Sequence, residues 1–349
     1  MEEPGSTGPD LRHRALFYRT SADYVAAVAD FLLADDAAAQ AAFVAVPADR
    51  HEQLRESLKP RLTTANGGIA GNGLTPDPAA PGDRPGATML ADATANTVFA
   101  DMAELGRNPG RILPAIQAFV AAAAGTRIRF VSEPIWPGRS PAEVREATRH
   151  EALLNLALAR ADAELLCLYN LTGLPEPVVE DACLTHPLLA GPDRDEPSPV
   201  FAGAGAVPPD CDQPLSAVPR EARVASYRDD LRAVRQLVAE QASQAALPDA
   251  RAVDFVLAAS EVAANTLRHT DSGGTVSLWQ NERELLCQLT DSGYIEDPLA
   301  GRRPPDRERP GGHGLWLVHQ VCDLVELRTS QLGTTVRLHM RRPTGTANA

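Results

Sequence analysis

The sequence predicts an α/β protein with two domains, and three observations carry this prediction. The chain has 349 residues, which is enough for two domains of roughly 100–200 residues each. Residues 191–222 are dense in Pro, Gly, Ala and Ser, so we expect a flexible linker there between an N-terminal domain, 11–190, and a C-terminal domain, 223–342. Short apolar runs alternate with helical runs before this segment, whereas helices precede paired strands after it.

The N-terminal domain is expected to be a mainly parallel sheet covered by helices, because βαβα alternation favours parallel pairing. Its expected strands are 15–18, 42–46, 127–131 and 164–169. Its expected helices are 22–34, 49–58, 94–105, 111–124 and 141–161. Within this domain, the Pro- and Gly-rich stretch 64–87 is expected to be a long mobile loop, and residues 1–10 a disordered N-terminus.

The C-terminal domain has a different order of elements. Helical runs at 224–245 and 249–269 precede strands at 275–280 and 284–290. A polar loop, 294–312, leads to a helix at 313–322 and then to the hairpin 324–330 and 334–340, with 343–349 as a tail. Helices on one side of a mixed or antiparallel sheet predict an α/β sandwich.

Composition narrows the class of protein. The hydrophobic fraction of 44% and the charged fraction of 23% are typical of globular proteins. The net charge of −13 argues against nucleic acid as the main partner, since phosphate contacts need a basic face. No run approaches the ~18 apolar residues of a membrane span, and the acidic first ten residues are unlike a signal peptide. With five cysteines and no CxxC pair, we expect a cytoplasmic protein with reduced thiols.

Three polar residues share one face of the helix expected at 249–269. Glu261, Asn265 and His269 follow one another at intervals of four residues. A carboxylate beside a carboxamide suits the orientation of a hydroxyl nucleophile near a hard divalent cation. A solvated helix face is the alternative interpretation of the same spacing.

Further polar and glycine motifs follow in the same domain. Asp291 ends a strand, where a carboxylate can accept a hydrogen bond from an exocyclic amine, and Gly293 lets a flat ring approach the backbone. The run Gly311–Gly314 opens a helix whose free N–H groups favour phosphate. Gly333, Thr334 and Thr335 begin the last strand. Taken singly, these motifs are more often plain turns, loops or caps.

The order and spacing of these motifs resemble the GHKL (Bergerat-fold, histidine-kinase-like) ATPases. ExxxNxxxH, DxG, GxGL and GTT follow one another over about 225–340. Within this group the chain looks most like the anti-sigma-factor serine kinases of the RsbW/SpoIIAB type. The resemblance implies ATP and Mg²⁺ as cofactors, with Asn265 helping to hold Mg²⁺ and Glu261 as general base toward a protein serine hydroxyl or a water.

The same resemblance assigns the adenine and phosphate contacts. Asp291 is expected to bind the adenine amino group, supported by Thr335 through water. Gly293, Gly312 and Gly314 are expected to let the nucleotide and the lid come together. His269 matches the pattern without a clear role. His313 stands where this group often has Arg, which is expected either to weaken phosphate contact or to make it sensitive to pH. Four arginines of the expected lid either offset γ-phosphate charge or belong to a solvated loop; they are Arg302, Arg303, Arg307 and Arg309.

Two other classes of phosphotransfer protein fit less well. The only lysine, Lys59, is followed by Pro60 and lacks a preceding GxxxxG, so the chain has no P-loop. A sensor histidine kinase needs an acceptor histidine on a helix just before its ATPase domain, and no histidine lies between His186 and His269. The dipeptide His150-Glu151 resembles an acceptor but lies before the expected linker.

The N-terminal domain resembles the MEDS sensory domains of bacterial signal transduction, which are proposed to sense small hydrocarbon derivatives. The resemblance spans about 13–190 and is carried by 13–18, 127–136, 151–155, 167–170 and 186–187. It is consistent with a pocket at the carboxyl ends of parallel strands. The candidate lining residues are His13, Trp136, Glu151, Asn155 and Tyr169. Core packing of the aromatic residues and a helix-surface position of Glu151 and Asn155 are the alternatives.

Together these resemblances imply a bacterial signalling regulator. We expect an anti-sigma-factor-type serine/threonine kinase, controlled by the sensory domain, that phosphorylates an antagonist protein of the STAS type. The implied partners are a sigma factor, that anti-anti-sigma protein, a small-molecule ligand of the N-terminal domain and, by analogy, a second copy of the chain. The alternatives are a non-catalytic ATP-binding interaction switch and a two-component histidine kinase, in which His150 would carry the phosphate.

Overall fold

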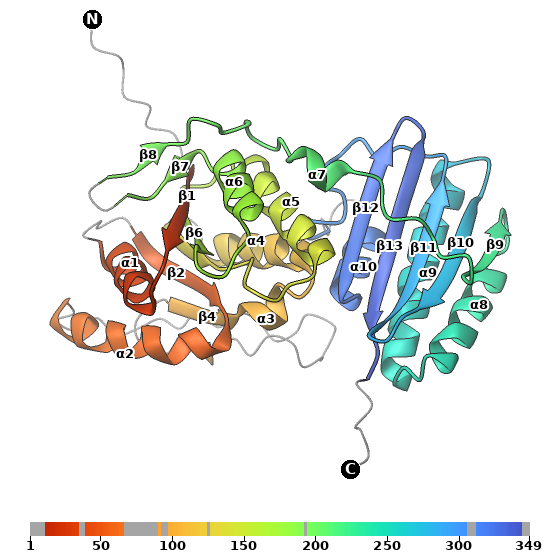
Figure 1. Ribbon diagram of the computed structural model, residues 1–349, viewed down its shortest axis with the longest axis horizontal. Coiled ribbons are helices and arrows are strands. Elements are labelled where there is room, and N and C mark those ends of the chain that lie inside the picture. The colour runs from red at the N-terminus through yellow and green to blue at the C-terminus, as the bar shows by residue number, and fades with distance from the viewer. Residues whose placement is uncertain are drawn as a thin grey trace, which may run out of the picture. The chain divides into compact units, whose positions relative to one another are not determined.

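The computed structural model describes residues 11–34, 39–65, 90–91, 97–123, 126–191, 194–305 and 312–343. The chain divides into two compact units, whose elements are shown in Figure 1. Unit 1 comprises Met1–Arg107 and Ala115–Pro208, and unit 2 comprises Asn108–Pro114 and Pro209–Ala349. The expected disordered N-terminus, most of the expected loop 64–87 and nearly all of the expected tail lie outside the described residues.

Unit 1 is built on an eight-stranded sheet in the order β3-β4-β2-β5-β6-β1-β7-β8. Its strands are β1 (Leu11–Tyr18), β2 (Ala39–Val46), β3 (Leu90–Ala91), β4 (Thr97–Asp101), β5 (Arg127–Ser132), β6 (Ala163–Asn170), β7 (Leu188–Leu189) and β8 (Glu196–Pro197). The strands from β4 to β7 in this order pair in parallel, whereas β3 and β8 are antiparallel to their neighbours at the two edges. The predicted mainly parallel α/β architecture is therefore confirmed.

The helices of unit 1 begin where the local sequence supplies caps. Thr20 and Ser140 form capping boxes with Asp23 and Glu143, which satisfy the first free N–H groups of the two helices. The helices are α1 (Ser21–Leu33), α2 (Ala48–Ala65), α3 (Met102–Leu105), α4 (Ile112–Ala122), α5 (Pro141–Ala157) and α6 (Glu176–Thr185). The 3₁₀ turn at Pro109–Arg111 and the start of α4 fall in the stretch Asn108–Pro114 of unit 2. The helix predicted at 94–105 is wrong over 97–101, because the β-branched and aromatic run TVFA forms β4, and correct over 102–105, which forms α3; residues 94–96 lie outside the described residues.

Unit 2 is an antiparallel five-stranded sheet with helices against one face. Its elements are α7 (Pro209–Asp212), β9 (Arg223–Tyr227), α8 (Leu231–Gln244), α9 (Asp249–His269), β10 (Gly274–Gln280), β11 (Glu284–Asp291), α10 (His313–Val321), β12 (Leu324–Ser330) and β13 (Gly333–Arg341). The strand order is β12-β13-β11-β10-β9. The predicted α/β sandwich is confirmed. The predicted helix 224–245 instead begins with β9, and Asp230 caps α8 three residues after that strand ends.

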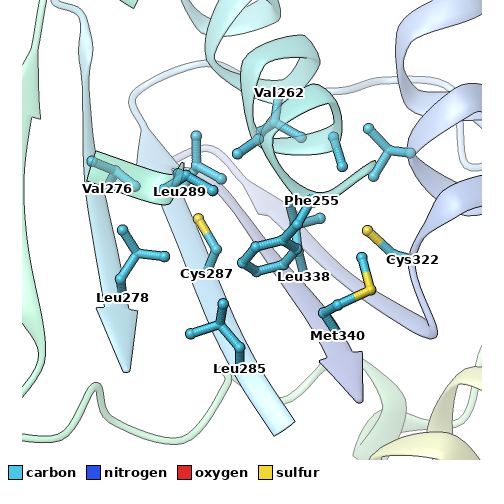
Figure 2. Packing of buried hydrophobic residues seen from close by; sticks show 14 of the residues in the cluster. Phe255, Val262, Val276, Leu278, Leu285, Cys287, Leu289, Cys322, Leu338 and Met340 are labelled. Atoms are coloured by element: carbon cyan, nitrogen blue, oxygen red, sulfur yellow. The ribbon is translucent and has the colours of Figure 1, made fainter. Parts of the chain in front are cut away.

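The core of unit 2 lies between the sheet and its helices. Figure 2 shows Phe255 and Val262 of α9 packed against alternate residues of three strands, including Cys287 and Leu338. These side chains are fully or nearly fully buried. Because strand residues alternate between faces, the residues between them point away from the helices. This alternation fixes which side chains of β11 and β13 reach the helix side of the sheet.

A segment distant in sequence completes unit 2. The side-chain amide of Asn108 donates to the carbonyl oxygens of His319 (3.0 Å) and Cys322 (3.4 Å) at the end of α10. Gly110 lies so close to the His319 ring that a Cβ atom there would come within 2.1 Å of Nδ1. Asn108 thus satisfies carbonyl groups that the helix end leaves unpaired. The sequence analysis placed this segment in the N-terminal domain and did not predict the contact.

The expected linker 191–222 is shared between the units. Its first part forms β8 in the sheet of unit 1. Its later part contacts the sheet of unit 2, where Arg337 donates to Ser216 and Arg328 to the carbonyl oxygen of Gln213. Both arginines come from the face opposite the helices, so this stretch passes over the outer face of that sheet. Within the described residues, no helix combines the length and apolar character needed to cross a membrane.

An ionisable cluster joins three strands on this outer face. His339 of β13 contacts Glu284 of β11 through Nδ1 (3.0 Å) and Glu326 of β12 through Nε2 (3.1 Å). Burial opposes the charged imidazolium, but the hydrogen bonds and negative charge of the two carboxylates outweigh it and raise the pKa of His339 from 6.5 to about 9.

We expect the free energy of unfolding of unit 2 to fall as the pH rises through about 9. The stabilisation from His339 is fully present below about pH 6.5 and is lost above the folded-state pKa, and it amounts to about 3 kcal/mol at about 1.4 kcal/mol per unit of pKa. Urea unfolding followed by the fluorescence of Trp279, with Trp136 and Trp316 replaced by Phe, measures this. The decrease in the free energy of unfolding between pH 7 and pH 10 should largely disappear in His339→Gln. It should persist in His269→Gln, a control at an exposed position.

Candidate functional site

A cavity of about 1320 Å³ lies within unit 2, between α9, the loop after β11 and the start of α10. It brings together most of the residues that the sequence analysis singled out. The lining includes Glu261, Asn265, His269, Asp291, Gly293, Gly312, His313 and Gly314. These residues come from separate elements, so the fold assembles motifs that are weak signals when taken singly.

Helix α9 presents Glu261 and Asn265 to the start of α10. The two side chains lie one turn apart, as their spacing predicts. A Cβ atom at Gly314 would lie 2.9 Å from Glu261 Oε2 and 3.4 Å from Asn265 Nδ2. Glycine therefore leaves room for the Glu261 carboxylate beside the first turn of α10. Asn265 Oδ1 also accepts a hydrogen bond from Arg268 Nη1 at 2.8 Å.

Asp291 is held at the end of β11 by two donors. Thr266 Oγ1 donates to Oδ2 at 2.6 Å, and the Gly293 backbone N–H donates to Oδ1 at 2.8 Å. The Tyr227 hydroxyl donates in turn to Thr266 Oγ1 at 3.0 Å. Burial raises the pKa of Tyr227 to about 12, so its hydroxyl stays protonated and remains a donor. This chain of hydrogen bonds fixes the orientation of the Asp291 carboxylate.

Sequence reasoning missed Thr266 and Tyr227. The signal available for Thr266 was a hydroxyl one residue after Asn265, among the mostly apolar buried residues of α9. Tyr227 lies on β9, which the sequence analysis had merged with the following helix. Its register opposite Gly274 places the hydroxyl against the side of α9, and nothing local in the sequence predicts this.

The last strand presents Thr334 to the cavity, not Thr335. Thr334 pairs with Asp291 across β11 and β13, and its hydroxyl donates to the Gly293 carbonyl oxygen at 2.8 Å. Thr335 pairs with Thr290, so strand alternation turns it to the opposite face. The expected support of Asp291 by Thr335 therefore has no geometric basis, and Thr334 takes the position beside the cavity.

Part of the expected lid is described. Arg303 lines the cavity and forms an ion pair with Asp297 at 3.4 Å, whereas Arg302 is buried. Arg307 and Arg309 lie outside the described residues. At the end of this loop, Gly312 caps α10 in the left-handed conformation, with φ of 76°. A β-carbon at this backbone angle would be strained, so glycine is favoured there.

The expected sensor residues lie in unit 1, where three of the five meet. His13 Nδ1 lies 3.0 Å from Asn155 Oδ1, and His13 Nε2 lies 3.1 Å from Glu151 Oε2. The Tyr169 ring packs edge-on against His186. Trp136 instead has the guanidinium of Arg139 over its ring, 4.2 Å from the ring centre. His13 and Glu151 are fully buried, so this group forms a closed polar cluster.

Comparisons with known proteins agree with this division. A family model for the MEthanogen/methylotroph, DcmR Sensory domain (MEDS) matches residues 79–187. A model for the histidine kinase-like ATPase domain matches residues 224–340. No curated protein matches the chain significantly.

Among solved structures, the chain is similar to the RsbU and RsbW domains of Rv1364c from Mycobacterium tuberculosis, at 18% identity and a TM-score of 0.27. The match covers 36% of this chain and 33% of that chain. The cavity and every residue that lines it lie within the match to the ATPase model. Two separate segments of the chain, 79–187 and 224–340, therefore match the MEDS family and the histidine kinase-like ATPase domain respectively.

Proposed function

We propose that unit 2 binds ATP with Mg²⁺ and transfers the γ-phosphate to a serine or threonine of a partner protein. One observation carries the proposal. Glu261 and Asn265 of α9, Asp291 after β11 and the glycines that open α10 line a single cavity, inside a segment that matches the histidine kinase-like ATPase domain. Carboxylate, carboxamide and helix N–H groups in one cavity suit a purine, a divalent cation and phosphate respectively.

The adenine end of the cavity is set by Asp291. Both carboxylate oxygens already accept hydrogen bonds from the protein, and each retains a second lone pair. A third donor, the amino group of adenine, fits a carboxylate fixed in this way. Gly293 keeps the approach open, because a Cβ there would lie 3.0 Å from Asp291 Oδ1 and 3.0 Å from Thr270 Cγ2.

The phosphate end lies where α9 meets α10. ATP supplies the phosphoryl group, and Mg²⁺ offsets its charge. Asn265 Oδ1 offers a hard oxygen ligand once it exchanges its bond to Arg268. The backbone N–H groups of the first turn of α10 bind phosphate oxygens. Glu261 Oε2, beside Gly314, takes the proton of the attacking hydroxyl.

The regulatory setting follows from the resemblance to anti-sigma kinases. We propose a sigma factor as the protein held by unit 2, a STAS-type antagonist as substrate, a small-molecule signal at unit 1 and pairing of two chains. A two-component role is disfavoured, because the His150 side chain is only 1% exposed and so is poorly placed to accept phosphate. An ATP-binding switch without transfer is the remaining alternative.

Replacing Asp291 with Asn should weaken ATP binding by about 10–100-fold. The change removes the charge and one acceptor, and hydrogen bonds to charged groups contribute about 1.5–3 kcal/mol. Isothermal titration calorimetry with Mg²⁺ and ATP measures the affinity. Asp271→Asn removes an exposed carboxyl outside the cavity and should bind like the wild type. Equal affinity of Asp291→Asn and wild type would contradict an adenine contact at this residue.

Two neighbouring threonines provide a matched test of the strand register. Thr334→Val removes the donor to the Gly293 carbonyl and should lower ATP affinity several-fold, at about 1 kcal/mol per lost hydrogen bond. Thr335→Val changes the same atoms on the other face and should leave the affinity unaltered. Competition with a fluorescent ATP analogue reports both. The opposite ranking would mean that Thr335 supports the adenine.

A variant of Glu261 distinguishes ATP binding from phosphate transfer. Glu261→Gln should keep ATP affinity within a few-fold but reduce phosphate transfer at least about 100-fold, the scale of a lost general base. The assay follows labelled phosphate from ATP to a co-encoded STAS-type protein. Glu240→Gln, at an exposed position on α8, serves as the control. Transfer that survives in Glu261→Gln would remove Glu261 as the base, and ATP binding without transfer by the wild type would favour the non-catalytic switch.

A further inference from the structure

A second polar cluster is sealed inside unit 1, away from the ATP cavity. It joins His13 of β1, Glu151 of α5, Cys167 of β6 and His186 at the end of α6, and none of the four side chains is exposed. One nitrogen, oxygen or sulfur atom of each residue lies within 4.8 Å of the others. We propose that these four residues bind one divalent transition-metal ion of the zinc class. This proposal does not depend on the proposed kinase activity.

Three of the six distances between the candidate ligand atoms are close to those of a tetrahedral site, and all six are within 4.8 Å. His13 Nε2 lies 3.1 Å from Glu151 Oε2 and 3.3 Å from Cys167 Sγ, and His186 Nε2 lies 3.2 Å from the same oxygen of Glu151. Bonds of about 2.0–2.3 Å from zinc to nitrogen, oxygen and sulfur place tetrahedral ligands about 3.3–3.7 Å apart. A metal ion therefore needs only small movements of the side chains. Two imidazoles, a thiolate and a carboxylate are a ligand set that zinc accepts.

Hydrogen bonds outside the cluster orient both imidazoles. His186 Nδ1 lies 2.8 Å from the carbonyl oxygen of Ala182, which can only accept, so Nδ1 carries the proton. Asn155 Nδ2 donates to the Thr185 carbonyl oxygen at 2.8 Å, which turns its amide oxygen toward His13 Nδ1 at 3.0 Å. His13 Nδ1 must then also carry a proton. In the neutral rings, the Nε2 lone pairs of both histidines point into the cluster. Metal sites use the same arrangement, in which the other ring nitrogen donates a hydrogen bond that orients the imidazole.

One buried atom of the cluster, Glu151 Oε1, lacks a hydrogen-bond partner, and His186 Nε2 contacts Glu151 only through Oε2, at 3.2 Å. Both atoms lie in a group of side chains with no exposed surface. An unpaired buried polar atom costs about 1–3 kcal/mol. A cation among them would pair with both the lone pair and the carboxylate. A metal-free ion pair between a protonated histidine and Glu151 is the competing interpretation.

Charge balance favours the metal-bound form. When the Sγ–metal bond forms, the Cys167 thiol releases its proton to solvent, and Glu151 binds as the carboxylate. Two negative ligands then neutralise a dipositive ion, while the imidazoles stay neutral. A buried site with no net charge avoids the desolvation cost of an isolated charge. Four protein ligands leave no open position, which is typical of structural rather than catalytic zinc.

Cobalt substitution tests the site in the full-length protein. After removal of bound metal with a chelator, the wild type should bind one equivalent of Co²⁺. It should then show the near-ultraviolet thiolate-to-cobalt band and the intense visible bands of tetrahedral cobalt, and Zn²⁺ should displace both. Cys167→Ser should lose the thiolate band, and His186→Gln should bind metal at least 10-fold more weakly. Cys183→Ser, which changes a cysteine outside the cluster, should behave as the wild type.

A second variant keeps the test decisive if loss of a ligand unfolds the protein. Asn155→Ala leaves all four ligands in place but removes the acceptor that orients His13, so it should weaken Co²⁺ binding about 10–100-fold and retain the thiolate band. The proposal is overturned if the wild type binds no stoichiometric metal, if its cobalt spectrum is octahedral without a thiolate band, or if Cys167→Ser binds like the wild type. Isothermal titration calorimetry of the same samples with ATP shows independently whether unit 2 binds ATP.

Discussion

The proposed ATP site depends on the close approach of α10 to α9, and the absence of a side chain at Gly314 favours this approach. The backbone of Gly314 lies so near Glu261 that a side chain there would occupy the space beside its carboxylate. The first turn of α10 and the side chains of Glu261 and Asn265 therefore line the same cavity. The proposed phosphate, cation and proton-transfer groups can therefore share one cavity, because the start of α10 lies against the polar face of α9.

Most of this site follows from sequence because its parts obey local periodicities. Glu261 and Asn265 share a face through the helical repeat, and the glycines open α10 where the pattern predicts a helix start. Thr334 and Thr335 are an example of what local periodicity cannot predict. The motif contains both, and only the register opposite Asp291 determines which one faces the cavity. Register is set by pairing across the whole sheet, so it is not encoded in the motif itself.

Other features could not be predicted from the sequence, because they depend on contacts between residues far apart in the chain. Asn108 reaches the end of α10 across more than 200 positions of the chain. The cluster in unit 1 draws its four residues from separate elements, and the sequence analysis had named only His13 and Glu151 as pocket residues. Cys167 and His186 carried the family resemblance but have no spacing typical of metal ligands. Parallel pairing of β1 with β6 is what places His13 and Cys167 on the same face of the sheet.

The two polar sites are built for different kinds of occupancy. In unit 2, Glu261, Asn265 and Asp291 are only partly buried and line an open cavity, so a ligand can enter and leave without unfolding the protein. In unit 1, His13 and Glu151 have no exposed surface, and anything held there is released only when β1, α5 or β6 separates. Exchange at the first site fits a phosphate donor that turns over. Retention at the second fits an ion that stabilises the fold, and a site this closed does not sample a dissolved hydrocarbon on the same timescale. The small-molecule signal proposed for unit 1 must therefore bind elsewhere in that unit or act by opening this cluster.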